Sequence, residues 1–156
     1  MRCNIDGVII KKVEKYRDHR GWLVELFRVD ELPPEYSPVM SYASMTGPGI
    51  TRGPHEHRDQ ADLFCFVGPS TFRLYLWDNR LHSATYRKHC TVEAGEDNYL
   101  MVLIPAGVVH AYKNIGTVDG LVFNAPNRLY RGRGRRDEVD EIRHEDDPDT
   151  IFTIDD

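Results

Sequence analysis

Short apolar runs separated by turn residues dominate the hydrophobic pattern of this chain. Within 72–77, apolar and polar side chains alternate with a period of two, as expected for a strand that buries one face. Gly, Pro, Asp or Asn bounds most of the runs, which favours tight turns between short strands. The predicted strands are Val8–Ile10, Trp22–Phe27, Leu63–Val67, Phe72–Trp77, Tyr99–Ile104 and Leu121–Asn124.

Helical character is confined to two stretches, Val29–Leu32, which two prolines end, and Asp137–Arg143. Many short strands with almost no helix predict an all-β sandwich or barrel. We expect residues 1–156 to form a single domain. The charged tail over 131–150 is expected to return to the barrel, because the apolar stretch Ile151–Ile154 follows it.

Composition and charge narrow the functional classes. The chain has 40% hydrophobic and 29% charged residues, which is ordinary for a soluble globular protein. A net charge of −5 gives no broad basic surface for nucleic acid or an anionic membrane. An anionic substrate must therefore meet a local arginine cluster. Arg131–Arg136 is one such cluster, and we interpret it as a solvated turn rather than a grip on a diphosphate.

The expected compartment follows from two further features. No apolar run approaches the ~20 residues of a membrane helix, and the start lacks the apolar region of a signal peptide. The cysteines are Cys3, Cys65 and Cys90, an odd number without CxxC spacing. We therefore predict a cytoplasmic protein whose thiols are reduced.

Three histidines follow turns that are marked by glycine and proline. If residues 55–57 form a strand, His55 and His57 point to the same face, because side chains alternate. With His110 from a second strand and Asp62, four polar groups could converge inside one barrel. Such a set can hold a metal ion, or it can place a histidine base in a sugar pocket.

Four short motifs carry a resemblance to a known family. They are Asp18–Phe27, Gly49–His55, Ile104–His110 and Asp147-Pro148. In this order they are similar to the D-x-R-G-x-x-x-E-x-F, G-V-L-R-G-L-H, I-P-x-G-x-A-H and N-D-P motifs of the dTDP-4-dehydrorhamnose 3,5-epimerase family. That family is a branch of the cupins. The resemblance implies a cupin-type jelly-roll barrel of antiparallel strands, a nucleotide-sugar substrate, a homodimer and no cofactor.

The resemblance also implies an isomerase that epimerises a nucleotide-linked 4-keto-6-deoxy sugar. A keto group acidifies the neighbouring C–H bonds, so a base can remove a proton that is then returned to the opposite face. By resemblance His55 is the base, Asp147 orients it, and Arg52 donates hydrogen bonds to the enolate oxygen or the diphosphate. The substrate-binding candidates are Arg20, Glu25, Ser44, His110 and Tyr130. The first two match positions that reach the nucleotide in part across the dimer interface.

Two positions depart from the family pattern. Phe123 stands where the resemblance places the catalytic tyrosine, and phenylalanine cannot deliver a proton. Asp62 stands where it places a lysine, so a cation that would stabilise the enolate is replaced by an anion. Single-centre epimerisation, keto-isomerisation and action on another sugar remain open.

Two alternative functions use the same barrel. His55, His57, Asp62 and His110 also match the metal-cupin pattern, with aspartate in place of glutamate. Three imidazoles and a carboxylate suit Zn, Fe, Ni or Mn and predict a metal-dependent isomerase or oxygenase. The other alternative is a non-catalytic sugar-binding barrel, which would bind its ligand without proton exchange.

Overall fold

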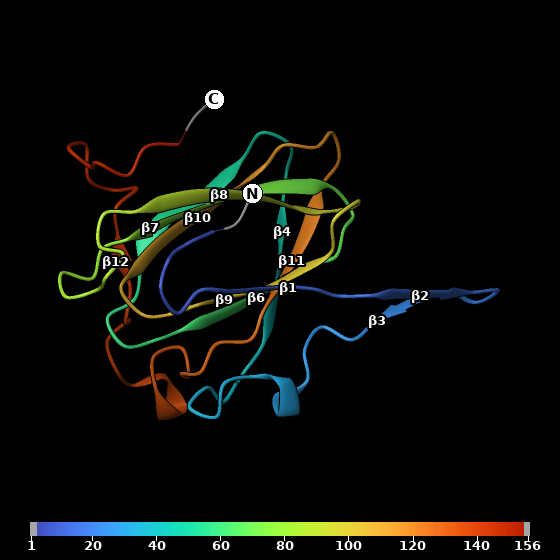
Figure 1. The fold of residues 1–156 in the computed structure, drawn as a ribbon, viewed down its shortest axis with the longest axis horizontal. Helices are drawn as coiled ribbons and strands as arrows, with labels where there is room; N and C mark the ends of the chain where they lie inside the picture. Colours follow the sequence, from blue (N-terminus) through green and yellow to red (C-terminus); the bar gives the residue numbers. More distant parts are fainter. Residues whose placement is uncertain (1–2, 155–156) are drawn as a thin grey trace.

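Two five-stranded antiparallel sheets face each other and form a jelly-roll barrel in the computed structural model, which describes residues 3–154 (Figure 1). In spatial order the first sheet contains β1 (Ile9–Lys12), β9 (Leu100–Ile104), β6 (Asp62–Phe66), β11 (Gly120–Asn124) and β4 (Tyr42–Thr46). The second contains β12 (Ile142–Arg143), β5 (Thr51–Glu56), β10 (Val108–Asn114), β7 (Thr71–Asp78) and β8 (His89–Gly95). The all-β prediction is therefore confirmed.

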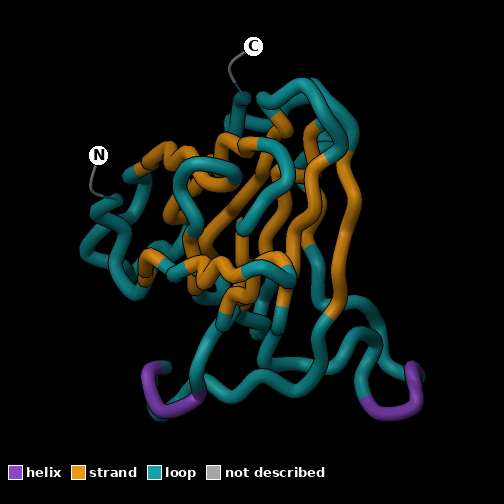
Figure 2. The backbone as a smooth tube through the Cα atoms, turned by 90° about the vertical axis from the view of Figure 1, so that its right-hand side faces the viewer, coloured by secondary structure: helices purple, strands orange, loops and turns teal. Residues whose placement is uncertain are grey.

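A separate hairpin of β2 (Lys15–Asp18) and β3 (Gly21–Val24) projects from the barrel (Figure 1). Two short 3₁₀ turns, Val29–Glu31 and Arg133–Arg135, lie in loops at one end of the barrel (Figure 2). Between residues 3 and 154, no helix is long or apolar enough to cross a membrane.

Each predicted strand is present, although the one predicted over Trp22–Phe27 ends at Val24, and the two helical expectations were wrong. The first stretch makes only the single turn Val29–Glu31, because the following prolines cannot continue a helix. The second stretch runs extended and ends in β12, which pairs antiparallel with β5. Pairing with an existing sheet edge outweighed the weak local helix propensity of this charged segment.

The apolar core lies on both sides of the first sheet. On β6, Phe64 and Phe66 point into the barrel, where Phe72, Val122 and other buried side chains surround them. The alternate residues, Leu63 and Cys65, face outward and are covered by the segment that carries Leu32 and Tyr36. Burial on both faces explains why β6 is a continuous apolar run after its first residue.

The cysteines correct the prediction of reduced thiols. Cys3 and Cys90 form a disulfide that ties the N-terminal segment to β8, and Cys65 is a free, buried thiol. The pairing joins residues that are 87 positions apart. Spacing between neighbouring cysteines could not indicate this bond, because it depends on how the chain folds back on itself.

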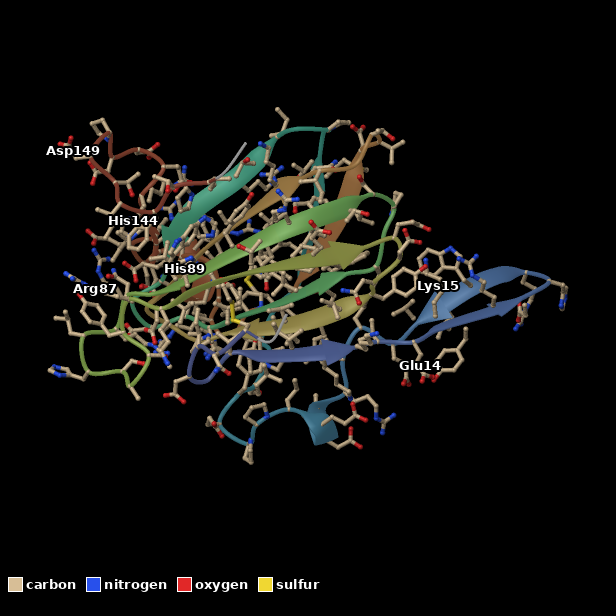
Figure 3. All side chains as sticks on the ribbon, turned by 45° about the horizontal axis from the view of Figure 1, so that its top comes forward. Glu14, Lys15, Arg87, His89, His144 and Asp149 are labelled. Carbon is tan, nitrogen blue, oxygen red and sulfur yellow. A yellow bond between two sulfur atoms is a disulfide. The ribbon has the colours of Figure 1, made fainter. Side chains whose placement is uncertain are left out.

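The tail returns to the barrel, as its apolar stretch predicted. Phe152 is buried, and its ring centroid lies 5.8 Å from that of Trp77 and 4.6 Å from that of His144. His144 in turn contacts buried Glu56, with 2.9 Å between Nε2 and Oε1. Figure 3 shows His144 against the barrel and Asp149 farther out along the tail.

Candidate active site

A cavity of about 1660 Å³ opens at one end of the barrel. Strands β4 and β5 line it from the two different sheets, and the segments 57–60, 126–132 and 137–145 complete the wall. Predicted site residues that line it are Ser44, Arg52, His55, His57 and Tyr130. The structure therefore brings half of the ten predicted site residues to the wall of one cavity.

A backbone irregularity in β5 aims the histidines. Opposite β10, His55 pairs with His110 and Arg52 with Tyr112, so β5 carries one extra residue between these pairs. Gly53 sits within this bulge with a φ of +83°, and a Cβ atom there would lie 2.6 Å from the carbonyl oxygen of His110. Only glycine allows this close approach of the two strands.

His55 is a neutral imidazole at the cavity wall. Burial, together with the neighbouring His110 and His57, lowers the pKa of His55 to about 2, because a further positive charge there is unfavourable. Its Nδ1 lies 3.9 Å from Glu141 Oε1. An unprotonated imidazole beside a carboxylate can accept a proton from a ligand in the cavity.

His57 and His110 both turn Nε2 toward Asp62. His57 donates from Nδ1 to the carbonyl of Asp140, and His110 donates from Nδ1 to the carbonyl of Val108 at 3.0 Å. A carbonyl only accepts, so each Nδ1 carries the hydrogen. The two Nε2 atoms then lie 3.1 and 3.4 Å from the same carboxylate oxygen, Asp62 Oδ2.

The charges in this group are strongly coupled. Burial alone would lower the pKa of His57, but the hydrogen bond and negative charge of Asp62 outweigh it and raise that pKa. Burial would raise the pKa of Asp62, but the imidazoles of His110 and His57 hold it well below its usual range. A proton on His57 therefore completes an ion pair with Asp62.

The same donor set fits a divalent transition metal. Ligand atoms of His55, His57 and His110 lie within 4.8 Å of one another. Among the described residues, His110 Nε2 is a buried atom without a hydrogen-bond partner, although Asp62 Oδ2 lies 3.4 Å away. Imidazoles whose Nδ1–H is held by a backbone carbonyl and whose Nε2 is free are typical metal ligands.

Sequence reasoning missed two polar side chains that position Asp62. Asn124 and Gln60 donate to Asp62 Oδ1, at 2.8 and 3.0 Å. Asn124 also accepts from the backbone N–H of Leu63 at 3.0 Å and contacts the hydroxyl of Tyr42 at 2.8 Å. An asparagine on the barrel-facing side of an otherwise apolar strand was the available signal.

Three predicted residues lie away from His55. Arg20 and Glu25 belong to the exposed hairpin region and are not among the described residues that line the cavity. Asp147 occupies an exposed turn, where its carboxylate accepts the N–H of Asp149 at 3.0 Å. The carboxylate beside His55 is instead that of Glu141, because the tail places the residues around β12 against β5.

The tail forms one wall of the cavity. The Asp140 carboxylate accepts the backbone N–H groups of Arg58 and Asp59, both at 3.0 Å, and of Gln60 at 2.8 Å. Arg131 and Arg135 also line the cavity, so the basic cluster borders the site rather than forming only a solvated turn.

An antiparallel jelly roll with histidines, a buried carboxylate and arginines around one open end defines a small-molecule-binding barrel of the cupin type. The chain belongs to the dTDP-4-dehydrorhamnose 3,5-epimerase family, whose model matches residues 2–136.

Relatives in two organisms support this assignment. A probable low-salt glycan biosynthesis epimerase of Haloferax volcanii is 40% identical over 129 residues, covering 81% of each chain. A spore coat polysaccharide biosynthesis protein of Bacillus subtilis is 35% identical over 147 residues, covering 94% of this chain and 93% of the relative. The crystal structure of a dTDP sugar isomerase from Desulfovibrio desulfuricans G20 superposes with a TM-score of 0.81 at 24% identity, covering 96% of this chain and 91% of that one. That likeness supports the fold.

Proposed function

We propose that this protein is an isomerase that epimerises a nucleotide-linked 4-keto-6-deoxy sugar by proton transfer next to the carbonyl. The observation that carries the proposal is His55, a neutral imidazole on the wall of a large cavity in a chain of the epimerase family. Its relatives include proteins named for epimerisation and for polysaccharide biosynthesis.

In the proposed reaction His55 accepts the proton from a carbon next to the keto group. The C–H electrons form the enolate double bond, and the carbonyl oxygen takes the negative charge. Arg52 directly flanks the bulge and lines the same cavity, so it is the proposed donor to that oxygen or to the diphosphate. Return of a proton to the opposite face restores the ketone with inverted configuration.

The size of the cavity and the arginines along its wall agree with a nucleotide sugar. A volume of about 1660 Å³ exceeds the ~300–1,000 Å³ of typical small-molecule pockets. Besides Arg52, the cavity is lined by Arg128, Arg131 and Arg135. Guanidinium groups bind two phosphate oxygens at once, which suits a diphosphate. A dTDP group and a role in dTDP-rhamnose biosynthesis are the specific form of this proposal.

We also propose a homodimer built through the projecting hairpin. Tyr16, Trp22 and Leu23 remain exposed there, and an isolated two-stranded hairpin has little stability of its own. Arg20 lies at its tip with 78% of its side chain exposed, so a partner subunit could receive it near its own cavity. Analytical ultracentrifugation tests the dimer, and a monomer at micromolar concentration would contradict it. A cytoplasmic location stays a prediction.

A divalent metal bound in the same cavity is the second candidate, favoured by the unpartnered Nε2 of His110. The imidazoles of His55, His57 and His110, with the carboxylate of Asp62 beside them, would hold it, and a metal there would supply Lewis-acid stabilisation of the enolate oxygen. Metal analysis of the purified protein, with a His57→Gln variant as control, tests this. Stoichiometric metal that is lost in the variant supports the site, and unchanged content contradicts it.

The proposed function is tested by deuterium wash-in. Protein without added metal is incubated in D₂O with dTDP-4-keto-6-deoxyglucose and followed by NMR. Deuterium at C3, C5 or both is the expected result and also counts the centres that react. Failure of both positions to exchange contradicts epimerisation of this substrate.

A further inference from the structure

An epimerase of this kind needs an acid opposite its base, and Phe123 does not occupy that place. The side chain of Phe123 packs on the outer face of the first sheet with the cluster of Leu63 and Cys65. The next residue, Asn124, is buried and points into the barrel toward Asp62. The residue that delivers a proton must therefore come from elsewhere in the cavity wall.

Tyr42 lies on the neighbouring strand at the matching position. In the β11–β4 pair, Tyr42 is directly opposite Asn124. Its side chain lines the cavity, and the residue is 45% exposed, so a ligand can reach the phenol. Tyr42 belongs to the first sheet and His55 to the second, so the two residues approach the cavity from different walls.

The polarity of one hydrogen bond directs the phenolic hydrogen. Asn124 Oδ1 accepts from the backbone N–H of Leu63, which fixes the Asn124 amide with its NH₂ group toward Tyr42 and Asp62. An NH₂ group only donates, so the oxygen of Tyr42 accepts at 2.8 Å. The hydroxyl hydrogen of Tyr42 remains available for an acceptor in the cavity.

One hydrogen bond favours the phenolate that forms when Tyr42 gives up its proton. A phenol is protonated at neutral pH, and burial raises the pKa of Tyr42 above its ordinary value. The hydrogen bond from Asn124 acts in the opposite direction, because it stabilises the phenolate that forms after transfer. Asn124 is therefore a positioning residue for Tyr42.

Two other tyrosines line the cavity but are placed less well. The hydroxyl of Tyr112 shares a hydrogen bond with Ser44 Oγ at 2.9 Å, and Tyr112 is buried to 3% exposure. Tyr130 lies outside the strands, is 55% exposed, and its backbone N–H contacts the sulfur of Met40. Neither phenol has an amide donor that fixes its oxygen.

We propose that Tyr42 is the catalytic acid, on the face of the sugar opposite His55. This proposal rests on the epimerase function proposed above. After His55 has taken the proton, the enolate carbon uses its π electrons to bond the proton of Tyr42, and the carbonyl re-forms. The O–H bond electrons stay on the phenolate oxygen. Transfer of the proton from His55 to Tyr42 through solvent then restores both groups.

The test separates proton removal from inversion. Wild type, Tyr42→Phe and Tyr130→Phe are incubated in D₂O with dTDP-4-keto-6-deoxyglucose, and NMR measures deuterium in unreacted substrate and inverted product. We expect Tyr42→Phe to exchange deuterium into the substrate, because His55 still removes and returns protons on one face. Its ratio of inversion to wash-in should fall roughly 10²–10⁴-fold. Tyr130→Phe should keep the wild-type ratio, whatever its substrate affinity.

Three results would overturn the proposal. One is inversion by Tyr42→Phe at the wild-type ratio. Another is equal loss of wash-in and inversion in a variant whose thermal melting matches wild type. The third is a collapse of the ratio in Tyr130→Phe instead. Absence of wash-in in the wild-type protein contradicts the epimerase function itself and removes the acid assignment with it.

Discussion

The apolar core and the polar end of the barrel are built from the same strands. On β6, Phe66 belongs to the core, whereas Asp62, four residues or about 13 Å away, belongs to the polar end. On β11 the corresponding barrel-facing pair is Val122 and Asn124. Phe64 marks the boundary, since its ring lies 5.5 Å from that of His110.

The difference teaches what each part of the alternating pattern does. In the core, close packing of apolar side chains stabilises the fold, and any residue of similar shape serves. At the polar end, buried groups cost stability unless each finds a partner, so their identities are constrained by chemistry. Mutations in the core should therefore change stability, and mutations at the polar end should change turnover.

The largest expected effect comes from a substitution of His55 at the polar end. In His55→Gln the proton acceptor is lost while a polar side chain of related size remains. Turnover should fall roughly 10²–10⁴-fold, as expected when a general base is removed. NMR measures the rate, and circular dichroism checks that the fold is retained. A folded variant with turnover close to wild type would contradict the role of His55 as the base.

The matching change in the core is Phe66→Ala. Phe66 is fully buried among Phe64, Phe72 and Tyr112, so the variant should lose about 3–5 kcal/mol of unfolding free energy in denaturant titrations. Phe66→Leu is the volume control and should lose less. If folded Phe66→Ala kept its unfolding free energy but lost turnover, the division between core and polar end would be wrong.

Lowering the pH should reduce the free energy of unfolding through the protonation of His55 in the unfolded chain. Its folded pKa of about 2 lies below the unfolded value, so the unfolded chain binds an extra proton as pH falls below about 6.5. Relative to His55→Gln, wild type should lose about 2–3 kcal/mol between neutral pH and about pH 4.5. Denaturant titrations of both proteins at the two pH values measure this. An unchanged difference would contradict a depressed pKa.

His57 and Asp62 contribute to stability in pH ranges that differ from that of His55. The pKa of His57 is raised, so its stabilising contribution is complete below its unfolded pKa and disappears as pH rises through the folded value. The pKa of Asp62 is lowered, so its contribution is present above the unfolded pKa and disappears only at more acidic pH. The comparison of wild type with His55→Gln cancels both contributions to first order.

The smallest expected effect concerns the tail. Asp140→Ala removes the acceptor for three backbone N–H groups that hold the segment 58–60. We expect a loss of about 1–2 kcal/mol in stability, because these groups can still reach water. A rise in KM with little change in kcat should accompany it. Asp140→Asn keeps one acceptor oxygen, so its stability should lie between those of wild type and Asp140→Ala. A loss of kcat as large as that of His55→Gln would contradict a purely structural role.

The sequence predicted the parts of the molecule that depend on local pattern. Alternation placed strand Phe72–Trp77 correctly and aimed His55 and His57 at one cavity. The alternating pattern could not show which face of β11 lies inside the barrel. In the structure Phe123 belongs to the outer cluster, whereas a shift of one residue in strand register would have put it inside. That is why Tyr42 was not recognised as a candidate acid.

Features that depend on the path of the chain could not be predicted. The resemblance selected Asp147 as the partner of His55, but the tail brings Glu141 there instead. The disulfide between Cys3 and Cys90 likewise depends on the N-terminal segment reaching β8. Both errors concern segments that cross the barrel surface, where local propensity carries little information.

The wall formed by 137–145 also bears on how such enzymes diverge. The family match covers residues 2–136, so this wall lies beyond the stretch that defines membership. Exchange of this short segment between relatives would alter what enters the cavity while leaving the strands that carry His55 and Tyr42 intact. Because Glu141 lies beside His55 and the Asp140 carbonyl accepts from His57, the same segment also sets the surroundings of the proposed base, so a graft would change substrate choice and catalysis together.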